Sequence, residues 1–256
     1  MSMNIVFDIG NTNIKMGVFD GDELVETLRL ASSNKTGDEY WLPIKEMLGV
    51  KGLSVRDVDG AIISSVNPNL NYTFENMVRT YFGFKPMTVG LGLKTGLNVR
   101  YDNPRELGAD RVADSVAAYR IYGGPCIVID CGTATTFNVV SRDGEFLGGA
   151  ISFGLKSAAE ALANSAARLP EVELSVPKRT IGRTTIANMQ SGIIYGYSGM
   201  IESMVARIKK EMGMPNIKVV ATGGIANLVN DCVSVIDVVD RTLTLRGLHL
   251  IYKLNS

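Results

Sequence analysis

Residues 3–10 read MNIVFDIG, and residues 126–132 read CIVIDCG. In each stretch an apolar run ends at an aspartate, Asp8 or Asp130, and a glycine follows two positions later. A short apolar run bounded by turn residues is typical of a buried strand. The sequence therefore predicts two buried strands, each with a carboxylate at its carboxyl end.

The residues that follow each aspartate repeat one pattern. Apolar residues alternate at 14, 16 and 18, Asp20 and Gly21 predict a tight turn, and residues 24–30 predict a returning strand. In the second half, a predicted strand at 136–140 leads to a turn at Asp143 and Gly144. The intervals from aspartate to turn almost match, at 12 residues (20 − 8) and 13 residues (143 − 130).

The two halves also share a later buried strand, and helices are expected between the strands. These strands lie at 60–66 and 218–221, and the helices are expected at 37–49, 71–81, 104–119 and 243–254. Strands followed by helices indicate an α/β fold, here with two domains of similar topology at 1–115 and 116–256. Each tripeptide or turn match alone would be chance, but their common order favours duplication.

Composition excludes several kinds of chemistry. The 256 residues contain 26 basic and 26 acidic side chains, which gives a net charge of zero and makes general attraction to nucleic acid or an anionic membrane unexpected. One histidine, His249, and three cysteines, Cys126, Cys131 and Cys232, offer no zinc-ligand spacing and no histidine-based triad. Catalysis would depend on carboxylates, hydroxyls, Lys or Arg, and backbone amides.

No targeting or membrane segment is expected from the sequence. The chain begins directly with an apolar strand, and the uncharged stretch at 184–201 contains polar residues and glycines that suit a buried helix. We therefore expect a cytoplasmic protein with reduced thiols.

The two aspartates and their neighbours predict a phosphate site. Carboxyl ends of strands are where open α/β sheets bind ligands, and glycine lets a phosphate approach the backbone. Two such turns facing each other would form a cleft for a polyphosphate and Mg²⁺, which binds few carboxylates together with water and phosphate oxygens. Taken singly, each aspartate is better interpreted as a turn or cap residue. Hydroxyl and amide donors follow both aspartates: Asn11, Thr12, Thr133, Thr135 and Thr136.

Residues 108–111 read GADR and open a predicted helix. From spacing alone, Asp110 is best interpreted as a helix cap. The alternative is functional: a carboxylate beside Arg111 could accept a hydroxyl proton while the guanidinium holds an anion.

Several motifs, in this order, resemble those of type III pantothenate kinases. They are DIGNTNIK (8–15), GADR (108–111), DCGTATT (130–136), GGAISFGLKSAAEALANSAARLP (148–170), IGRTT (181–185), MQSGIIYGY (189–197), ATGGIA (221–226) and LTLRGL (243–248). The resemblance covers essentially the whole chain. It implies membership of the acetate and sugar kinase, Hsp70 and actin superfamily, with two duplicated ribonuclease-H-like domains and a cleft between them.

The resemblance also implies a reaction, ligands and site residues. The reaction is ATP-dependent phosphorylation of pantothenate to 4′-phosphopantothenate, the first step toward coenzyme A, with Asp110 as general base. Asp130 would bind a monovalent cation, K⁺ or NH₄⁺, and Asp8 would hold Mg²⁺ through phosphate or water. Pantothenate would contact Tyr101, Gly108, Ala109, Asp110, Arg111 and Thr185. ATP would contact Asp8, Ile9, Gly10, Asn11, Thr12, Asn13, Ile14, Lys15, Thr133, Gly223 and Gly224.

Family members pair through a subunit interface, so the resemblance implies a homodimer. Residues 184–200 are a candidate interface helix, and a core helix is an equally good interpretation. One departure from the family is Phe153, which stands where a proline is usual and adds bulk near the nucleotide. The alternative function is a non-catalytic, nucleotide-binding regulatory relative, which would be expected to lack Asp8, Asp110 or Asp130.

Overall fold

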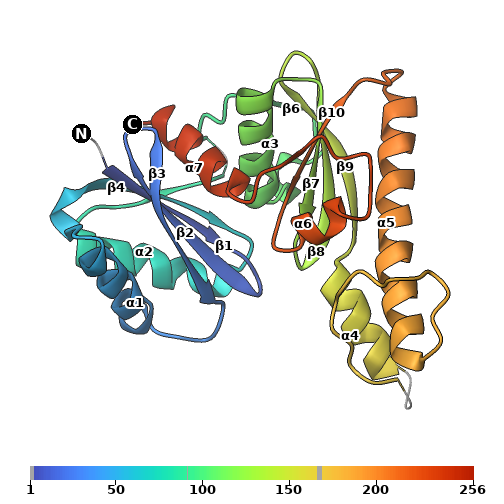
Figure 1. The fold of residues 1–256 in the computed structure, drawn as a ribbon. Helices are drawn as coiled ribbons and strands as arrows, with labels where there is room; N and C mark the ends of the chain where they lie inside the picture. Colours follow the sequence, from blue (N-terminus) through green and yellow to red (C-terminus); the bar gives the residue numbers. More distant parts are fainter. Residues whose placement is uncertain (1–2, 91, 166–168) are drawn as a thin grey trace. The chain divides into compact units, whose positions relative to one another are not determined.

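The first sheet is built around β1 (Met3–Ile9), which is buried along its whole length. The computed structural model describes residues 3–90, 92–165 and 169–256. In the order β3-β2-β1-β4-β5, β1 pairs with β2 in antiparallel fashion and with β4 in parallel fashion (Figure 1). The second sheet has the order β11-β10-β7-β8-β9-β6.

The strands and helices have the following bounds. The strands of the first sheet are β1, β2 (Asn13–Asp20), β3 (Glu23–Ala31), β4 (Val58–Ser65) and β5 (Met87–Thr88). Those of the second are β6 (Asn98–Val99), β7 (Cys126–Cys131), β8 (Ala134–Val140), β9 (Glu145–Phe153), β10 (Lys218–Thr222) and β11 (Val238–Val239). The helices are α1 (Gly37–Val50), α2 (Pro68–Phe82), α3 (Ala109–Tyr122), α4 (Leu155–Ser165), α5 (Thr185–Glu211), α6 (Ala226–Asn230) and α7 (Leu243–Lys253).

The predicted duplication is confirmed by the strand pairing. In each sheet three consecutive strands form an antiparallel meander, β1-β2-β3 or β7-β8-β9. A later strand then pairs in parallel with the first strand of the meander, β4 with β1 and β10 with β7. The α/β prediction is therefore correct for both halves of the chain.

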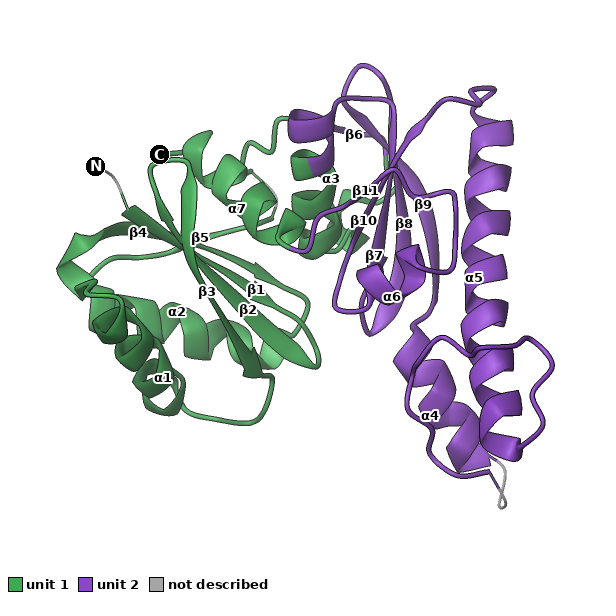
Figure 2. Ribbon diagram, in the orientation of Figure 1, with its two compact units in different colours: residues 1–97, 101–117, 242–256 green, residues 98–100, 118–241 purple. Residues whose placement is uncertain are grey.

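The chain divides into two compact units (Figure 2). The first contains residues 1–97, 101–117 and 242–256, and the second contains 98–100 and 118–241. These units differ from a single division near residue 115 chiefly in the placement of α7. Its apolar residues, including Leu245, Leu248 and Ile251, pack with Val6 and Ile62 of the first sheet.

Helices cover both faces of the first sheet. Because side chains alternate along a strand, Ile5 and Phe7 of β1 face the core formed with α1 and α2, whereas Val6 faces α7 and α3. In the second unit, Ile127 and Ile129 of β7 belong to a core shared with α5 and α6.

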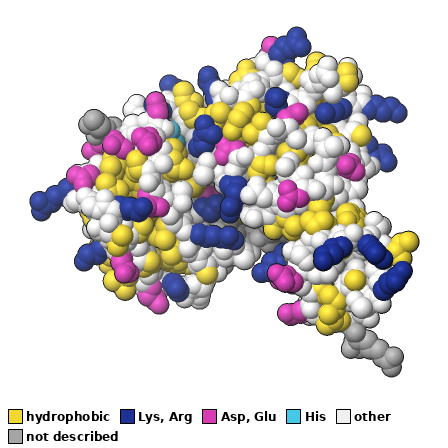
Figure 3. Space-filling model, viewed as in Figure 1, with side chains coloured by type: hydrophobic (Ala, Val, Ile, Leu, Met, Phe, Trp, Pro, Cys, Tyr) yellow, Lys and Arg dark blue, Asp and Glu magenta, His cyan; other side chains and the backbone are white. Residues whose placement is uncertain are grey.

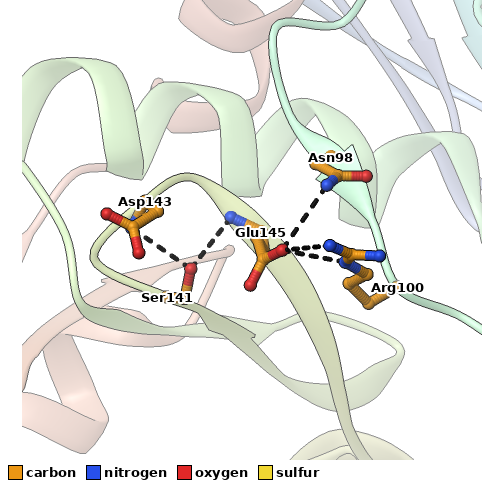
Figure 4. A network of polar contacts seen from close by, with 5 residues as sticks. All are labelled: Asn98, Arg100, Ser141, Asp143 and Glu145. Atoms are coloured by element: carbon orange, nitrogen blue, oxygen red, sulfur yellow. Dashed lines mark hydrogen bonds and ion pairs between the residues drawn. The ribbon is translucent and has the colours of Figure 1, made fainter.

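A short edge strand in the second unit comes from the segment that precedes the GADR residues. β6 pairs in parallel with the start of β9, and Glu145 Oε1 lies 2.8 Å from Arg100 Nε and accepts a 3.5 Å bond from Asn98 (Figure 4). Ser141 Oγ accepts backbone N–H bonds from Asp143 and Glu145, which closes the β8–β9 turn. This strand of only two residues was not predicted from the sequence.

The surface shows no membrane-spanning element in the described parts of the chain. Across residues 3–90, 92–165 and 169–256, no helix is both long and apolar enough to cross a membrane. Basic and acidic side chains are interspersed over the face shown in Figure 3.

Candidate functional site

In the first unit, Asp8 lies at the end of β1 directly opposite Lys15 of β2. Its carboxylate is 3.5 Å from Lys15 Nζ and only 7% of the residue is exposed. Burial raises the pKa of Asp8, Lys15 lowers it, and the negative charge of Asp110 raises it further. Asp8, Lys15 and Asp110, all predicted site residues, are therefore close enough to interact in one unit.

The turn between β1 and β2 is held tightly. Gly10 donates its N–H to the Asn13 carbonyl at 3.0 Å, and a Cβ on Gly10 would lie 2.9 Å from the same oxygen. Two side chains of β3 and the loop that follows it support this turn: Ser32 Oγ donates to the Gly10 carbonyl at 2.6 Å, and Arg29 Nε donates to Asn13 Oδ1 at 3.0 Å. Ser32 and Arg29 were not predicted, since neither belongs to the DIGNTNIK motif.

Asp110 lies in the first turn of α3 but is not its N-cap, so the interpretation from spacing is wrong. The Gly108 carbonyl accepts the first helical bond, from Val112, which makes Gly108 the cap. Asp110 Oδ1 instead accepts the N–H of Arg111 at 2.7 Å. A Cβ on Gly108 would lie 2.5 Å from Asp110 Oδ1, so this carboxylate position requires glycine at 108.

The predicted substrate residues of the first unit also lie together. Arg111 is 6% exposed, and its guanidinium carbon lies 5.9 Å from the centre of the Tyr101 ring. This distance is within the range of a cation–π contact. Thr185, by contrast, belongs to the second unit, where it is the exposed first residue of α5.

In the second unit, Asp130 occupies the position that corresponds to Asp8. It lies on β7 in register with Thr222 of β10. Gly223 has a φ of +99°, and a Cβ there would lie 2.5 Å from both Asp130 Oδ1 and the Cys131 carbonyl oxygen. The absence of a side chain at 223 therefore leaves space between these two oxygens.

The oxygen donors around Asp130 fit a hard cation. Thr222 Oγ1 is fully buried and has no hydrogen-bond partner among the described residues. Together with the Asp130 carboxylate and the Cys131 carbonyl it forms an oxygen donor set, which suits K⁺ better than a thiophilic metal. Burial raises the pKa of the Cys131 thiol to about 12, which keeps it protonated.

Asp8 and Asp110 also fit a divalent cation. The carboxylate of Asp8 interacts with the negative charge of Asp110 and the positive charge of Lys15, and burial already disfavours the charged form of Asp8. A cation held through phosphate or water would offset that cost.

The turn that carries Thr133 lies between β7 and β8, and Thr133 is exposed. Gly224 is exposed after β10, and nothing would obstruct a Cβ there. Phe153, the departure from the family pattern, ends β9 and is 55% exposed.

The predicted segment 184–200, interpreted either as an interface helix or as a core helix, lies mostly within α5. One stripe of α5, formed by Ile194, Tyr197, Ile201 and Val205, packs into the core of the second unit. Ile186, in the first turn of α5, is 51% exposed. The core interpretation is therefore correct for one face of this helix.

Comparison with known proteins identifies the family. The profile of the family described as Type III pantothenate kinase matches residues 4–207. A Type III pantothenate kinase from Geobacillus sp. (strain WCH70) is 48% identical over 254 residues, which cover 99% of this chain and 98% of the relative. A non-catalytic regulatory role is not favoured by these matches.

Solved structures with low sequence identity share the fold. A Baf family transcriptional activator from Campylobacter jejuni has a TM-score of 0.61 at 21% identity, with 98% of each chain covered. An inorganic polyphosphate/ATP-glucomannokinase from Arthrobacter sp. strain KM has a TM-score of 0.55 at 15% identity, with 100% of each chain covered. With a matching profile over most of its length and a relative of nearly half identical sequence, the chain belongs to the type III pantothenate kinase family.

Proposed function

We propose that the protein transfers the γ-phosphoryl group of ATP to the primary hydroxyl of pantothenate in the cytoplasm, with Asp110 as general base. Family membership supports the reaction. The observation that carries the residue assignment is the gathering of Asp8, Lys15 and Asp110 in the first unit. Phosphoryl transfer depends mainly on positioning and charge neutralisation, which suits this set.

Asp110 and Arg111 divide two tasks at the start of α3. Asp110 accepts the proton of the attacking hydroxyl, and Gly108 leaves room for its carboxylate. Arg111, whose guanidinium lies over Tyr101, pairs with the substrate carboxylate. Adjacent residues thus bind the anionic group and activate the hydroxyl.

Two turns bind the phosphates. In the first, the tight Gly10–Asn13 turn brings backbone close to the ligand, and Lys15 supplies positive charge. In the second, Thr133 contacts ATP, with Gly223 and Gly224 on the adenosine side. Mg²⁺ near Asp8 and K⁺ or NH₄⁺ near Asp130, when bound, neutralise phosphate charge.

A coupled assay of pantothenate-dependent ADP release tests this assignment. Asp110→Asn is expected to lower kcat by ~10²–10⁴-fold, the usual contribution of a general base, with a much smaller change in KM for pantothenate. Asp143→Asn is the matched control, because it makes the same substitution in the β8–β9 turn of the second unit. Near-normal turnover in Asp110→Asn would contradict the role of Asp110. Comparing assays with K⁺, NH₄⁺ and Na⁺ tests the monovalent cation.

We also propose that the protein is a homodimer, in which Thr185 contributes to pantothenate binding. The support is an exposed apolar group in the second unit near the start of α5, where Ile181 is 83% exposed and Ile186 is 51% exposed. Light scattering after size exclusion measures the oligomeric state. A monomer at micromolar concentration would contradict this proposal, and Ile186→Asp should shift a dimer toward monomer.

A further inference from the structure

Hydrogen bonds from α4, the end of β9 and α5, all in the second unit, hold the turn that carries Thr133 and the strand that follows it. The turn itself is closed by the N–H of Gly132, which donates to the Ala134 carbonyl at 3.1 Å. Of the supporting side chains, Thr135 was predicted among the donors of the phosphate site, but it is fully buried and its hydroxyl bonds to the Phe153 carbonyl. Their contacts decide the conformation in which the turn meets a ligand.

Support from α4 fixes a carbonyl. Ser157 Oγ donates to the Thr133 carbonyl at 3.0 Å. In a trans peptide the carbonyl and the following N–H point in opposite directions. Holding the Thr133 carbonyl toward Ser157 therefore turns the N–H of Ala134 away from α4.

The link from α5 consists of two hydroxyl groups, those of Tyr197 and Thr135, and the donor in each hydrogen bond follows from the number of protons available. Thr135 Oγ1 donates its single proton to the Phe153 carbonyl at 2.8 Å. Tyr197 Oη lies 2.6 Å from the same Thr135 oxygen, so Tyr197 must be the donor in that bond. The order is therefore Tyr197 to Thr135 to Phe153.

This chain of hydroxyls is buried and joins three elements. Tyr197 is 2% exposed and Thr135 is fully buried, so water does not compete for either bond. Thr135 lies two residues after Thr133, and Phe153 is paired with Ala134 across β8 and β9. The Tyr197 ring also lies 6.4 Å from the Phe153 ring, which anchors the end of β9.

We propose that Tyr197, acting through Thr135, is a positioning residue that holds the Gly132–Ala134 turn in its ATP-binding conformation. A turn that is already ordered loses less freedom when ATP binds, and this improves affinity. Tyr197 does not touch the nucleotide. The inference rests on the proposed role of Thr133 in binding ATP.

Tyr197→Phe removes one hydroxyl and keeps the ring. KM for ATP is expected to rise about fivefold, which corresponds to the net ~1 kcal/mol of one neutral hydrogen bond, while KM for pantothenate stays unchanged. The matched control is Tyr195→Phe on the same helix, whose hydroxyl donates to the Pro177 carbonyl at 3.0 Å. It loses the same group from the same helix, but the bond that is lost ends at Pro177 and not at Thr135.

Variants at Thr135 separate positioning from general stability. Thr135→Val should reproduce the rise in KM for ATP, and Thr135→Ser, which keeps the hydroxyl, should restore it. The double variant Tyr197→Phe with Thr135→Val should be no worse than Thr135→Val alone, because both remove one connected unit. Equal changes in both KM values, or additive effects, would overturn the proposal.

Thr133→Ala distinguishes failure of this inference from failure of the proposed ATP site. If Thr133→Ala raises KM for ATP and Tyr197→Phe does not, the positioning role of Tyr197 is wrong and the site assignment stands. If Thr133→Ala leaves KM for ATP unchanged, the ATP role of this turn is itself wrong.

Discussion

Gly154 should be required for efficient use of ATP although it carries no side chain. It follows β9 and packs against the turn that bears Thr133. A Cβ on Gly154 would lie 2.6 Å from the Gly132 carbonyl oxygen, and closer still to that of Thr133. Ordinary contact begins at 3.4 Å, so Gly154→Ala would push the Gly132 carbonyl by about 0.8 Å (3.4 − 2.6).

That displacement sets the expected size of the effect. Errors of about 1 Å in positioning cost up to ~10²-fold in rate, so kcat/KM for ATP should fall by roughly 10- to 100-fold. Crowding a packed region should also lower the free energy of unfolding of the second unit by ~1–3 kcal/mol. KM for pantothenate should change much less, because Tyr101 and the GADR residues belong to the first unit.

Steady-state kinetics with ATP varied, together with thermal unfolding, measure both effects. Gly49→Ala is the matched control, since it lies in α1 and nothing within 4 Å would meet its Cβ. It should leave kinetics unchanged and stabilise the helix by up to ~1 kcal/mol. A folded Gly154→Ala protein with wild-type kcat/KM for ATP would refute the steric reasoning.

Two further predictions concern α7. His249 is 4% exposed, with Nδ1 3.0 Å from Asn4 Oδ1 and Nε2 3.2 Å from Asp22, which also pairs with Lys253. Burial lowers the pKa of His249 below 6.5, and Asp22 opposes this. As pH falls, His249 is therefore protonated in the unfolded chain before it is protonated in the folded protein, so the stability that neutral His249 contributes is present above pH 6.5 and is lost as pH falls below 6.5. Below pH 6.5 the slope of Tm against pH should be shallower in His249→Gln than in the wild type. An unchanged slope would exclude His249 as the source of this pH dependence. Gly247→Ala would drive a Cβ into the Ala113 carbonyl of α3, so urea unfolding should show the first unit destabilised by ~1–3 kcal/mol, and wild-type stability would argue against that close contact.

The elements predicted best were those whose own residues determine them. The run ending at Asp8 is buried on both faces of β1, and its apolar pattern needs no distant partner to be recognised. The two-residue strands β5 and β6 were not predicted, since they exist only through pairing with β4 and β9. The helix expected from 104 begins at Ala109, because Pro104–Glu106 forms a separate 3-10 turn.

In the candidate site too, local motifs were predicted and contacts between distant residues were not. Asp8 and Lys15 were both predicted as site residues, but their opposition across β1 and β2 was not, because it depends on the register of that pairing. Tyr197 could not be found in this way, because it lies 62 residues from Thr135 and meets it only after α5 packs on the sheet. The missed contact of Ser32 with Gly10 likewise depends on where β3 ends.

The position of α7 has a consequence for how the chain acquires its structure during synthesis. The apolar face formed by Val6, Phe19 and Ile62 is covered by residues from the last fifteen of the chain. Residues 118–241 leave the ribosome before that helix does, so the second unit can fold while one side of the first sheet is covered by α3 but not yet by α7. A chain cut before residue 242 would therefore keep every element of the second unit and lack the helix that completes the first one.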